Sequence, residues 1–280
     1  MKGYVVVNGY YSSEASRHQA DRLLEALRQR SVDVSVYRNN RPWLIGETLS
    51  ADFAVFFDKD VNLARALERN GTRVFNSAKT IEDSDDKVRC NIILQSNGVP
   101  VTQTIPSPKK YSNETDGEFL REVGNTLGYP LVVKASCGSM GREVFLAESY
   151  GSLMEIDRRL GSVDRLYQRY NAESKGKSIR AIVIGGKALC AMKLTNEKDF
   201  RSNAYLGGKG EEIILTESWV EVAETAAKAL DADYCGVDLF CDKPEVIEVN
   251  SNAYFLSMEK VTGCDVAASY ADYIIGRMRE

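Results

Sequence analysis

Histidine is almost missing from this chain of 280 residues, which contains a single one, His18, in a charged helical stretch. The scarcity argues against a zinc site built on histidine and against a serine–histidine–aspartate triad. We expect His18 at the surface. The six cysteines include no Cys-x-x-Cys pair. Free thiols and a cytoplasmic location are therefore expected, because the cytoplasm keeps thiols reduced.

Long apolar runs and basic clusters are missing as well. No run of about 18 apolar residues is present, and the short strand after Lys2 lacks the length and cleavage site of a signal peptide. The net charge is −4, without a Lys/Arg block. We expect neither a membrane nor a nucleic acid as a partner. The hydrophobic fraction of 44% and the charged fraction of 27% are ordinary for a soluble enzyme.

What is present over the first 80 residues is an alternation of strand and helix patterns. Apolar strands at residues 4–7 and 51–57 flank a helical pattern at residues 13–30. Such alternation is typical of a small, mostly parallel sheet. No Gly-x-Gly-x-x-Gly follows the first strand, so the dinucleotide fingerprint is absent.

The rest of the chain is richer in strands. One helix is predicted over residues 80–96, and two strands flank a glycine-rich turn within residues 131–147. A hairpin turns at Gly185-Gly186. The pattern predicts an α/β (α+β) fold.

Three oxygen-bearing side chains interrupt two apolar runs near the C-terminus: Asp238 in the first run, Glu248 and Asn250 in the second. The runs are typical of adjacent strands, and residues two apart share a strand face. Asp238 joins the other two if the hairpin pairs. The trio is consistent with a Mg²⁺ site that leaves room for phosphate oxygens. It is equally consistent with a solvent-facing polar edge, and spacing alone leaves both open.

Lys134 ends an apolar strand and precedes a loop of small residues, 135–141. Backbone N–H groups of such loops bind phosphate, and a lysine adds charge; an ordinary hairpin is the alternative. Lys87 taken alone is typical of a surface lysine. Arg180 lies inside an apolar strand, which indicates an anionic partner. The loop at residues 199–208 is long enough to suggest a function.

The chain resembles the ATP-grasp superfamily, and its RimK-like branch of carboxylate–amine ligases in particular. The resemblance rests on motifs that occur in the family's order: Lys87, Lys134 with its loop, Arg180, Asp199-Phe200-Arg201-Ser202-Asn203, and Asp238, Glu248 and Asn250. The later segment from Glu259-Lys260-Val261-Thr262-Gly263 to Ala267 is similar to that branch's closing motif. The likeness covers residues 75–275.

The resemblance implies the fold and its division. Residues 1–80 would form a pre-ATP-grasp substrate domain, residues 81–172 a small central subdomain with the glycine-rich loop, and residues 173–280 a C-terminal β-rich subdomain with the metal site.

The resemblance also implies a role for each motif. ATP contacts are implied for Lys87, Lys134, Gly138, Ser139, Met140 and Gly141, and for an adenine hinge at Gln168, Arg169 and Tyr170. Asp238, Glu248 and Asn250 would hold Mg²⁺, with Mn²⁺ as an alternative. Arg180, Arg201 and Asn203 would act on the transferring phosphoryl group or the substrate.

The implied reaction joins a carboxylate to an amine through an acyl phosphate, with release of ADP and phosphate. The carboxylate would belong to a small molecule or a peptide and the amine to an acceptor such as an amino acid, and a homo-oligomer is left open. Two alternatives remain: an ATP-grasp kinase or carboxylase, and a non-catalytic nucleotide-binding regulatory protein. The last is motivated by Arg169 and Ser178, which stand where the family has Glu and Asp. The segment 251–255 lacks the Pro-Gly that many members of the family have, and its Tyr254 and Phe255 are expected to reshape the acceptor pocket.

Overall fold

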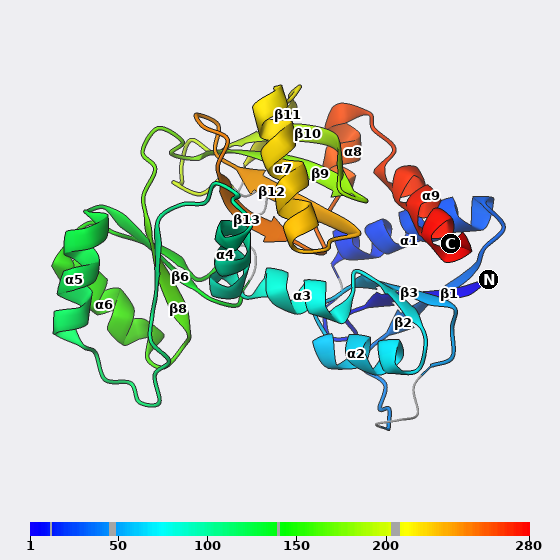
Figure 1. Cartoon of the computed structure of the whole chain (residues 1–280), viewed down its shortest axis with the longest axis horizontal. Helices are drawn as coiled ribbons and strands as arrows, with labels where there is room; N and C mark the ends of the chain where they lie inside the picture. The colour runs from blue at the N-terminus through cyan, green and yellow to red at the C-terminus, as the bar shows by residue number, and fades with distance from the viewer. Residues whose placement is uncertain (12, 45–48, 139–140, 203–207) are drawn as a thin grey trace.

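The computed structural model describes residues 1–11, 13–44, 49–138, 141–202 and 208–280, and its described strands form three sheets (Figure 1). The strands are β1 (Lys2–Val7), β2 (Asp33–Arg38), β3 (Phe53–Phe57), β4 (Arg73–Phe75), β5 (Thr104–Pro106), β6 (Leu131–Ala135), β7 (Val144–Ala147), β8 (Arg165–Arg169), β9 (Lys177–Ile184), β10 (Lys187–Thr195), β11 (Lys209–Glu212), β12 (Tyr234–Leu239) and β13 (Val246–Asn250). The helices are α1 (Glu14–Gln29), α2 (Val61–Arg69), α3 (Ala78–Asp85), α4 (Lys87–Ser96), α5 (Gly117–Leu127), α6 (Tyr150–Leu160), α7 (Glu217–Ala229), α8 (Leu256–Thr262) and α9 (Val266–Arg279).

The first sheet is parallel, in the order β2-β1-β3-β4. Val5 and Val55 pack toward α1 and α9, whereas Val6 and Phe56 pack toward α2 and α3. Because neighbouring residues of a strand point to opposite faces, a sheet covered on both sides requires continuous apolar strands. That requirement explains the unbroken apolar run of β3.

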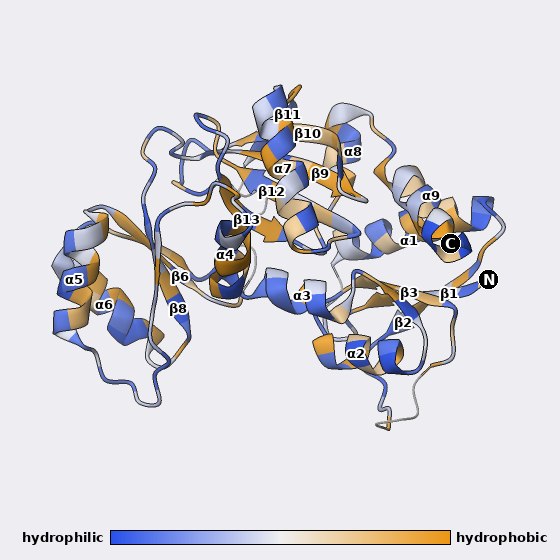
Figure 2. Ribbon diagram, viewed as in Figure 1, coloured by the Kyte–Doolittle hydropathy of each residue, from blue (hydrophilic) through white to orange (hydrophobic). Residues whose placement is uncertain are grey.

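The second sheet is antiparallel, in the order β5-β8-β6-β7. Leu131, Val133 and Tyr167 face α5 and α6 and form a separate core with them. Figure 2 shows the hydrophobic faces of α5 and α6 turned toward these strands. The alternate residues, Val132 and Lys134, therefore lie on the opposite face, toward the third sheet.

The third sheet is antiparallel, in the order β11-β10-β9-β12-β13. Ala181 and Val237 face α4 and α7, and Ile182 and Tyr234 face α8 and α9. Helix α4 thus packs on the third sheet although it precedes the second in sequence.

The predicted α/β (α+β) class is confirmed, with its parallel N-terminal sheet and β-rich C-terminal part. The boundaries at residues 80 and 172 remain predictions.

The single helix predicted over residues 80–96 is wrong, because two helices, α3 and α4, meet at Asp86. Asp86 has an extended backbone conformation, and its carboxylate accepts hydrogen bonds from the N–H groups of Val88 (2.9 Å) and Arg89 (3.2 Å). These bonds satisfy the free amides at the start of α4. The break makes Lys87 the first residue of α4, and its backbone N–H donates to Ser136 O (2.9 Å). Lys87 is thereby tied to the glycine-rich turn.

Among the described residues, no helix is both long and apolar enough to cross a membrane.

Candidate functional site

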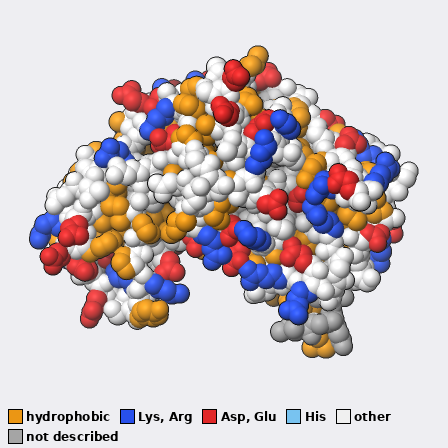
Figure 3. Space-filling model, viewed as in Figure 1, with side chains coloured by type: hydrophobic (Ala, Val, Ile, Leu, Met, Phe, Trp, Pro, Cys, Tyr) orange, Lys and Arg blue, Asp and Glu red, His pale blue; other side chains and the backbone are white. Residues whose placement is uncertain are grey.

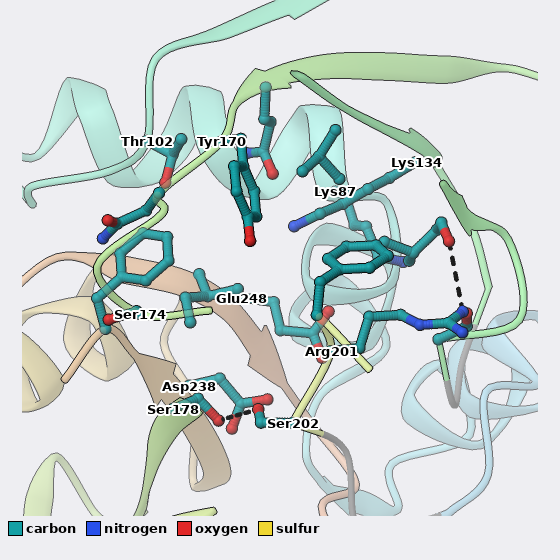
Figure 4. A pocket seen from close by; sticks show the side chains of 18 of the residues that line it. Lys87, Thr102, Lys134, Tyr170, Ser174, Ser178, Arg201, Ser202, Asp238 and Glu248 are labelled. Carbon is teal, nitrogen blue, oxygen red and sulfur yellow. Dashed lines mark hydrogen bonds between the residues drawn. The ribbon is translucent and has the colours of Figure 1, made fainter. Parts of the chain in front are cut away.

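A pocket lies between the second and third sheets, where β6 and β8 face β12 and β13 (Figure 4). Its empty space is about 1000 Å³ with the open mouth included. Many predicted site residues line it: Lys87, Lys134, Gly138, Gly141, Gln168, Arg169, Tyr170, Arg201, Asp238 and Glu248.

The other predicted site residues lie elsewhere. Asn250 lines an adjoining pocket that shares Lys87 and Glu248 with the first. Arg180 does not line the main pocket and is paired with Asp238. Ser139, Met140 and Asn203 fall outside the described residues.

Two lysines form one wall of the pocket. Lys134 is only 8% exposed, because it lies within β6 on the face opposite the α5–α6 core. Burial lowers the pKa of Lys134 to about 8, although the Glu248 carboxylate acts in the opposite direction. Lys87 reaches the same wall from α4, and its Nζ donates to Gly138 O (3.1 Å). Figure 4 shows both lysines on the side opposite Glu248 and Asp238.

Acidic residues form the facing wall. Asp238 pairs in register with Arg180 on β9 and with Glu248 on β13, so the three side chains form a row across one sheet face. Arg180 Nε and Nη2 donate to the two carboxylate oxygens of Asp238, each at 2.6 Å. Burial raises the pKa of Asp238, and the Arg180 guanidinium opposes the rise. The carboxylate is therefore compensated by Arg180 from the strand on the other side of β12 from Glu248.

Glu248 is held ionised by the opposite wall. Burial alone would raise the pKa of its carboxyl. The charges of Lys87 and Lys134, together with the hydrogen bond from Asn250 and the charge of Arg180, outweigh burial and bring the pKa to about 2. Asn250 Nδ2 also donates to Glu248 Oε1 (3.1 Å). Glu248 is therefore the fixed negative charge that the lysines face.

The acidic wall has the donor chemistry of a hard-cation site. In the part of the chain that the structure describes, no three His, Cys, Asp or Glu side chains are grouped so that they could hold a metal. Asp238, Glu248 and Asn250 supply two carboxylates and one amide. Mg²⁺ commonly takes one or two carboxylates and completes its shell with phosphate and water oxygens. The residues present fit Mg²⁺ on that basis.

Part of the pocket lining is apolar. Val132 lines it from β6, and Phe240 and Ile247 line it from the third sheet. A slot between apolar walls suits a flat aromatic ring. Sequence reasoning missed these three residues, because an apolar residue in a strand carries no signal for a ligand. Sequence spacing could have pointed to two of them. Val132 lies two positions from Lys134 and Phe240 two positions from Asp238, and residues two apart in a strand share a face.

The predicted hinge lies at the end of β8, beside this apolar slot. Gln168 Nε2 donates to Thr104 Oγ1 (2.8 Å) on β5, which fixes the strand edge. The Arg169 side chain is exposed, and its Nη2 lies 3.5 Å from Thr126 O. Tyr170 lines the pocket next to it.

The loop after β10 closes one side of the pocket. Arg201 pairs with Asp199 (Nη2–Oδ2 2.7 Å) and donates to Gly141 O, in the glycine-rich turn. Gly141 has φ of 69°, a conformation that favours glycine. Ser178 and Ser202 are hydrogen-bonded through their hydroxyls (2.5 Å). Ser178, one of the departures from the family pattern, therefore holds the loop against β9.

The expectation for Tyr254 and Phe255 is partly wrong. Phe255 is fully buried, and its ring packs edge-on against Phe57 and Tyr234 (centroids 6.1 and 6.4 Å apart). It is a core residue, because it fills the space between the first and third sheets. Tyr254 is 40% exposed and lines a separate pocket at the first sheet.

Comparison with solved structures identifies the architecture as an ATP-grasp fold. An ATP-grasp RimK domain protein from Sphaerobacter thermophilus aligns with a TM-score of 0.75 over 98% of this chain and 99% of that one, at 19% identity. The model of the RimK-like ATP-grasp domain matches residues 84–274. The chain therefore belongs to the RimK-like ATP-grasp family, and the predicted resemblance is confirmed.

Two relatives illustrate how the chain compares within the family. It is 33% identical to N-acetylaspartylglutamate synthase A of Mus musculus over 221 residues, which cover 77% of this chain and 57% of that protein. It is 33% identical to a probable alpha-L-glutamate ligase of Picosynechococcus over 290 aligned positions, covering 94% of this chain and 93% of that one. The chain thus spans little more than half of the synthase and nearly the whole of the ligase.

Proposed function

We propose that this chain is an ATP- and Mg²⁺-dependent ligase that joins a carboxylate to an amine through an acyl phosphate, releasing ADP and phosphate. The observation that carries the proposal is the opposition of charge across the pocket. Lys87 and Lys134 face Glu248 and Asp238 in a member of the RimK-like family. The two relatives, one called a synthase and the other a ligase, support the reaction class.

The pocket offers a place for each part of ATP. The adenine ring would lie in the apolar slot between Val132 and Phe240, beside the backbone of Gln168, Arg169 and Tyr170. The phosphates would extend toward Lys87, Lys134 and the loop that contains Gly138, Ser139, Met140 and Gly141. Lys134 suits this role because a charge acts more strongly where water is excluded.

The acidic wall would hold the metal. Mg²⁺, or Mn²⁺ in its place, would neutralise phosphate charge when bound to Asp238, Glu248 and Asn250. Arg180 would orient Asp238 by gripping both carboxylate oxygens. Glu248 would be available as an anion at neutral pH, because its pKa is about 2.

The reaction needs positioning more than a protein nucleophile. A carboxylate oxygen of the substrate bonds to the γ-phosphorus as the bond to the ADP oxygen breaks. The amine nitrogen then attacks the acyl carbon and loses a proton as phosphate leaves. Orientation and charge neutralisation dominate such phosphoryl transfers. Arg201 is proposed to contact the transferring group, and Asn203 to position the substrate.

The three segments would divide this work. Residues 1–80 would recognise substrate, residues 81–172 would bind the nucleotide and residues 173–280 would hold the metal. A homo-oligomer and a cytoplasmic location belong to the same proposal. The carboxylate would be that of a small molecule or peptide, and the amine that of an amino acid.

The test is ADP release with a panel of carboxylates and amines, with L-glutamate the first amine because one relative is called an alpha-L-glutamate ligase. The expected result is ADP formation that requires both partners, and a condensed product in the mass spectrum. A carboxylate labelled with ¹⁸O should pass one labelled oxygen to phosphate, as an acyl phosphate requires. Nucleotide binding without ADP across the panel, or a phosphorylated or carboxylated product, would overturn the proposal.

A further inference from the structure

A buried asparagine, Asn76, ties the first sheet to the two strands that carry the acidic wall. It directly follows β4 and is 1% exposed. Its Nδ2 donates to Tyr234 O (2.6 Å), at the start of β12, and to Ser251 O (2.7 Å), directly after β13. Its Oδ1 accepts from Tyr234 N (3.1 Å). One amide group thus makes three hydrogen bonds across the boundary between two sheets.

These bonds lie at the end of the hairpin where β12 begins and β13 ends. The two strands are antiparallel, and Gly236 pairs with Asn250, the last residue of β13. Two residues before Gly236, the Asn76 amide gives Tyr234 both a donor and an acceptor, as a neighbouring strand would. A Cβ at Gly236 would lie 2.6 Å from Ala253 Cβ, so the segment after β13 packs directly on β12. Asn76 therefore fixes the point at which the chain leaves β13.

This fixed point adjoins the acidic wall. Ser251 is buried and directly follows Asn250, whose Nδ2 donates to Glu248 Oε1 (3.1 Å). A shift of the backbone at Ser251 would therefore displace Asn250 and, through its hydrogen bond, the Glu248 carboxylate. Metal affinity depends steeply on such placement, because removal of groups that orient metal ligands typically weakens it about 10- to 100-fold.

Thr80 on α3 provides a matched comparison. It is also 1% exposed, and its Oγ1 lies 3.0 Å from Leu230 O and 3.0 Å from Asp231 O, between α7 and β12. Thr80 therefore joins the same two parts of the chain as Asn76 does, through the same kind of bond. The segment that Thr80 holds carries none of the predicted site residues, whereas the segment that Asn76 holds begins next to Asn250.

We propose that Asn76 is a positioning residue of the metal site: by fixing the end of β13, it holds Asn250 and Glu248 in the geometry that binds Mg²⁺. The inference rests on the proposed ligase function, because that function assigns the metal to the acidic wall. It gives residues 1–80 a second role besides substrate recognition. They preorganise the metal end of a site to which they supply none of the proposed ligands.

The experiment measures the affinity of the full chain for ADP by calorimetry, once with excess Mn²⁺ and once with a chelator. The ratio of the two dissociation constants, here called the metal factor, reports the contact between metal and acidic wall. The metal-free affinity reports the lysine wall. Asn76→Ala should lower the metal factor about tenfold and leave the metal-free affinity unchanged. An unchanged metal factor would overturn the proposal.

Two variants on α3 separate positioning from stability. Thr80→Val removes a buried hydroxyl and should lower the urea midpoint, as Asn76→Ala does, but leave the metal factor unchanged. Lys79→Ala removes an exposed ion pair with Asp83 (2.5 Å) and should change neither quantity. Figure 3 shows basic and acidic side chains mixed over α3 and α4, where such pairs lie at the surface. An equal fall of the metal factor in Asn76→Ala and Thr80→Val would overturn the positioning role.

Hydrogen exchange gives a second readout that needs neither metal nor turnover. In Asn76→Ala, the backbone amides of residues 249–253 and of Tyr234 should exchange faster than in the parent, because the end of β13 is no longer held. Thr80→Val should leave these amides unchanged. Parent-like exchange in the asparagine variant would contradict the fixed point. Asn76→Ser, which keeps a smaller donor, should change both readouts in the same directions and replaces the alanine variant if that one does not fold.

Glu248→Gln distinguishes a failure of this inference from a failure of the proposed function. If Glu248→Gln lowers the metal factor and Asn76→Ala does not, the metal site stands and the positioning role of Asn76 falls. If Glu248→Gln leaves the metal factor unchanged, the metal assignment in the proposed function falls, and the role of Asn76 falls with it.

Discussion

The two walls of the main pocket carry opposite charge and arise in opposite ways. The acidic wall is local, because Asp238 and Glu248 lie in register within one hairpin. The cationic wall joins Lys87 from a helix to Lys134 from a strand of another sheet. Each wall nevertheless sets the protonation of the other: the lysines help to bring the pKa of Glu248 to about 2, and Glu248 opposes the fall in the pKa of Lys134. The comparison shows that the site is one electrostatic unit built from two independent parts of the chain.

The largest effect should come from the acidic wall. Glu248→Gln keeps the shape of the side chain but removes the charge that the metal and the lysines share. We expect ADP release to fall about 10³-fold, as for the loss of a preorganised charge at a developing anion. Steady-state rates over a range of Mg²⁺ concentrations provide the measurement. Near-normal rates with normal Mg²⁺ dependence would show that the acidic wall does not hold the metal.

The next effect is on stability, and it concerns Arg180, which compensates the buried charge of Asp238 in the acidic wall. Arg180→Met leaves the buried Asp238 carboxylate uncompensated, so the free energy of unfolding should fall by about 3 kcal/mol. The double variant Arg180→Met with Asp238→Leu should recover much of that loss, since an apolar pair needs no compensation. Lys193→Met, which breaks an exposed pair with Glu211, is the matched control and should change stability by less than about 1 kcal/mol. Urea unfolding of the three variants measures these free energies. An equal loss of stability in Arg180→Met and Lys193→Met would contradict the prediction.

The cationic wall should show a smaller effect. Lys134→Ala removes a desolvated charge from the proposed phosphate end and should raise the ATP concentration needed for half-maximal rate up to about 100-fold. The exposed Lys109 lies outside the pocket lining, and Lys109→Ala should leave the ATP requirement unchanged. An unchanged ATP requirement in the Lys134 variant would remove the residue from the phosphate site.

The smallest effect is on the pH dependence of nucleotide binding. It separates the two walls, because Lys134 and Glu248 change their protonation in different pH ranges. Lys134 has a pKa of about 8, so it is protonated below that pH and neutral above it. Phosphate prefers the protonated form, so the dissociation constant of Mg·ADP should be level below pH 7 and rise above pH 8, by at most about tenfold per pH unit. Lys134→Arg should flatten the profile, because a guanidinium stays charged. Glu248 should contribute nothing in this range, since its pKa is about 2. Calorimetric titration between pH 6.5 and about 9.5 tests both statements, and a parent profile as flat as that of the arginine variant would contradict the role of Lys134.

Much of the architecture could be predicted because its signals are local. The apolar run of β3, the turn at Gly185-Gly186 and the hairpin that carries Asp238 each depend on residue types within a few positions. The break at Asp86 was missed, because an aspartate inside a helical pattern is identified as a cap only when its side chain turns back to the next amides. Phe255 was expected in the acceptor pocket but lies in the core. Its burial depends on residues remote in sequence that pack around it.

The sequence by itself determined the strands, the polar residues that interrupt them and the order of motifs that marks the family, because these depend on side-chain chemistry and short-range periodicity. Tertiary structure decided which charges meet. It placed Arg180 beside Asp238, set Lys134 opposite Glu248, and brought the ends of β1, β2 and β3 beside the segment after β13. The physical reason is that ionisation and ligand binding depend on distances and burial between residues remote in sequence, and only packing of the three sheets sets those.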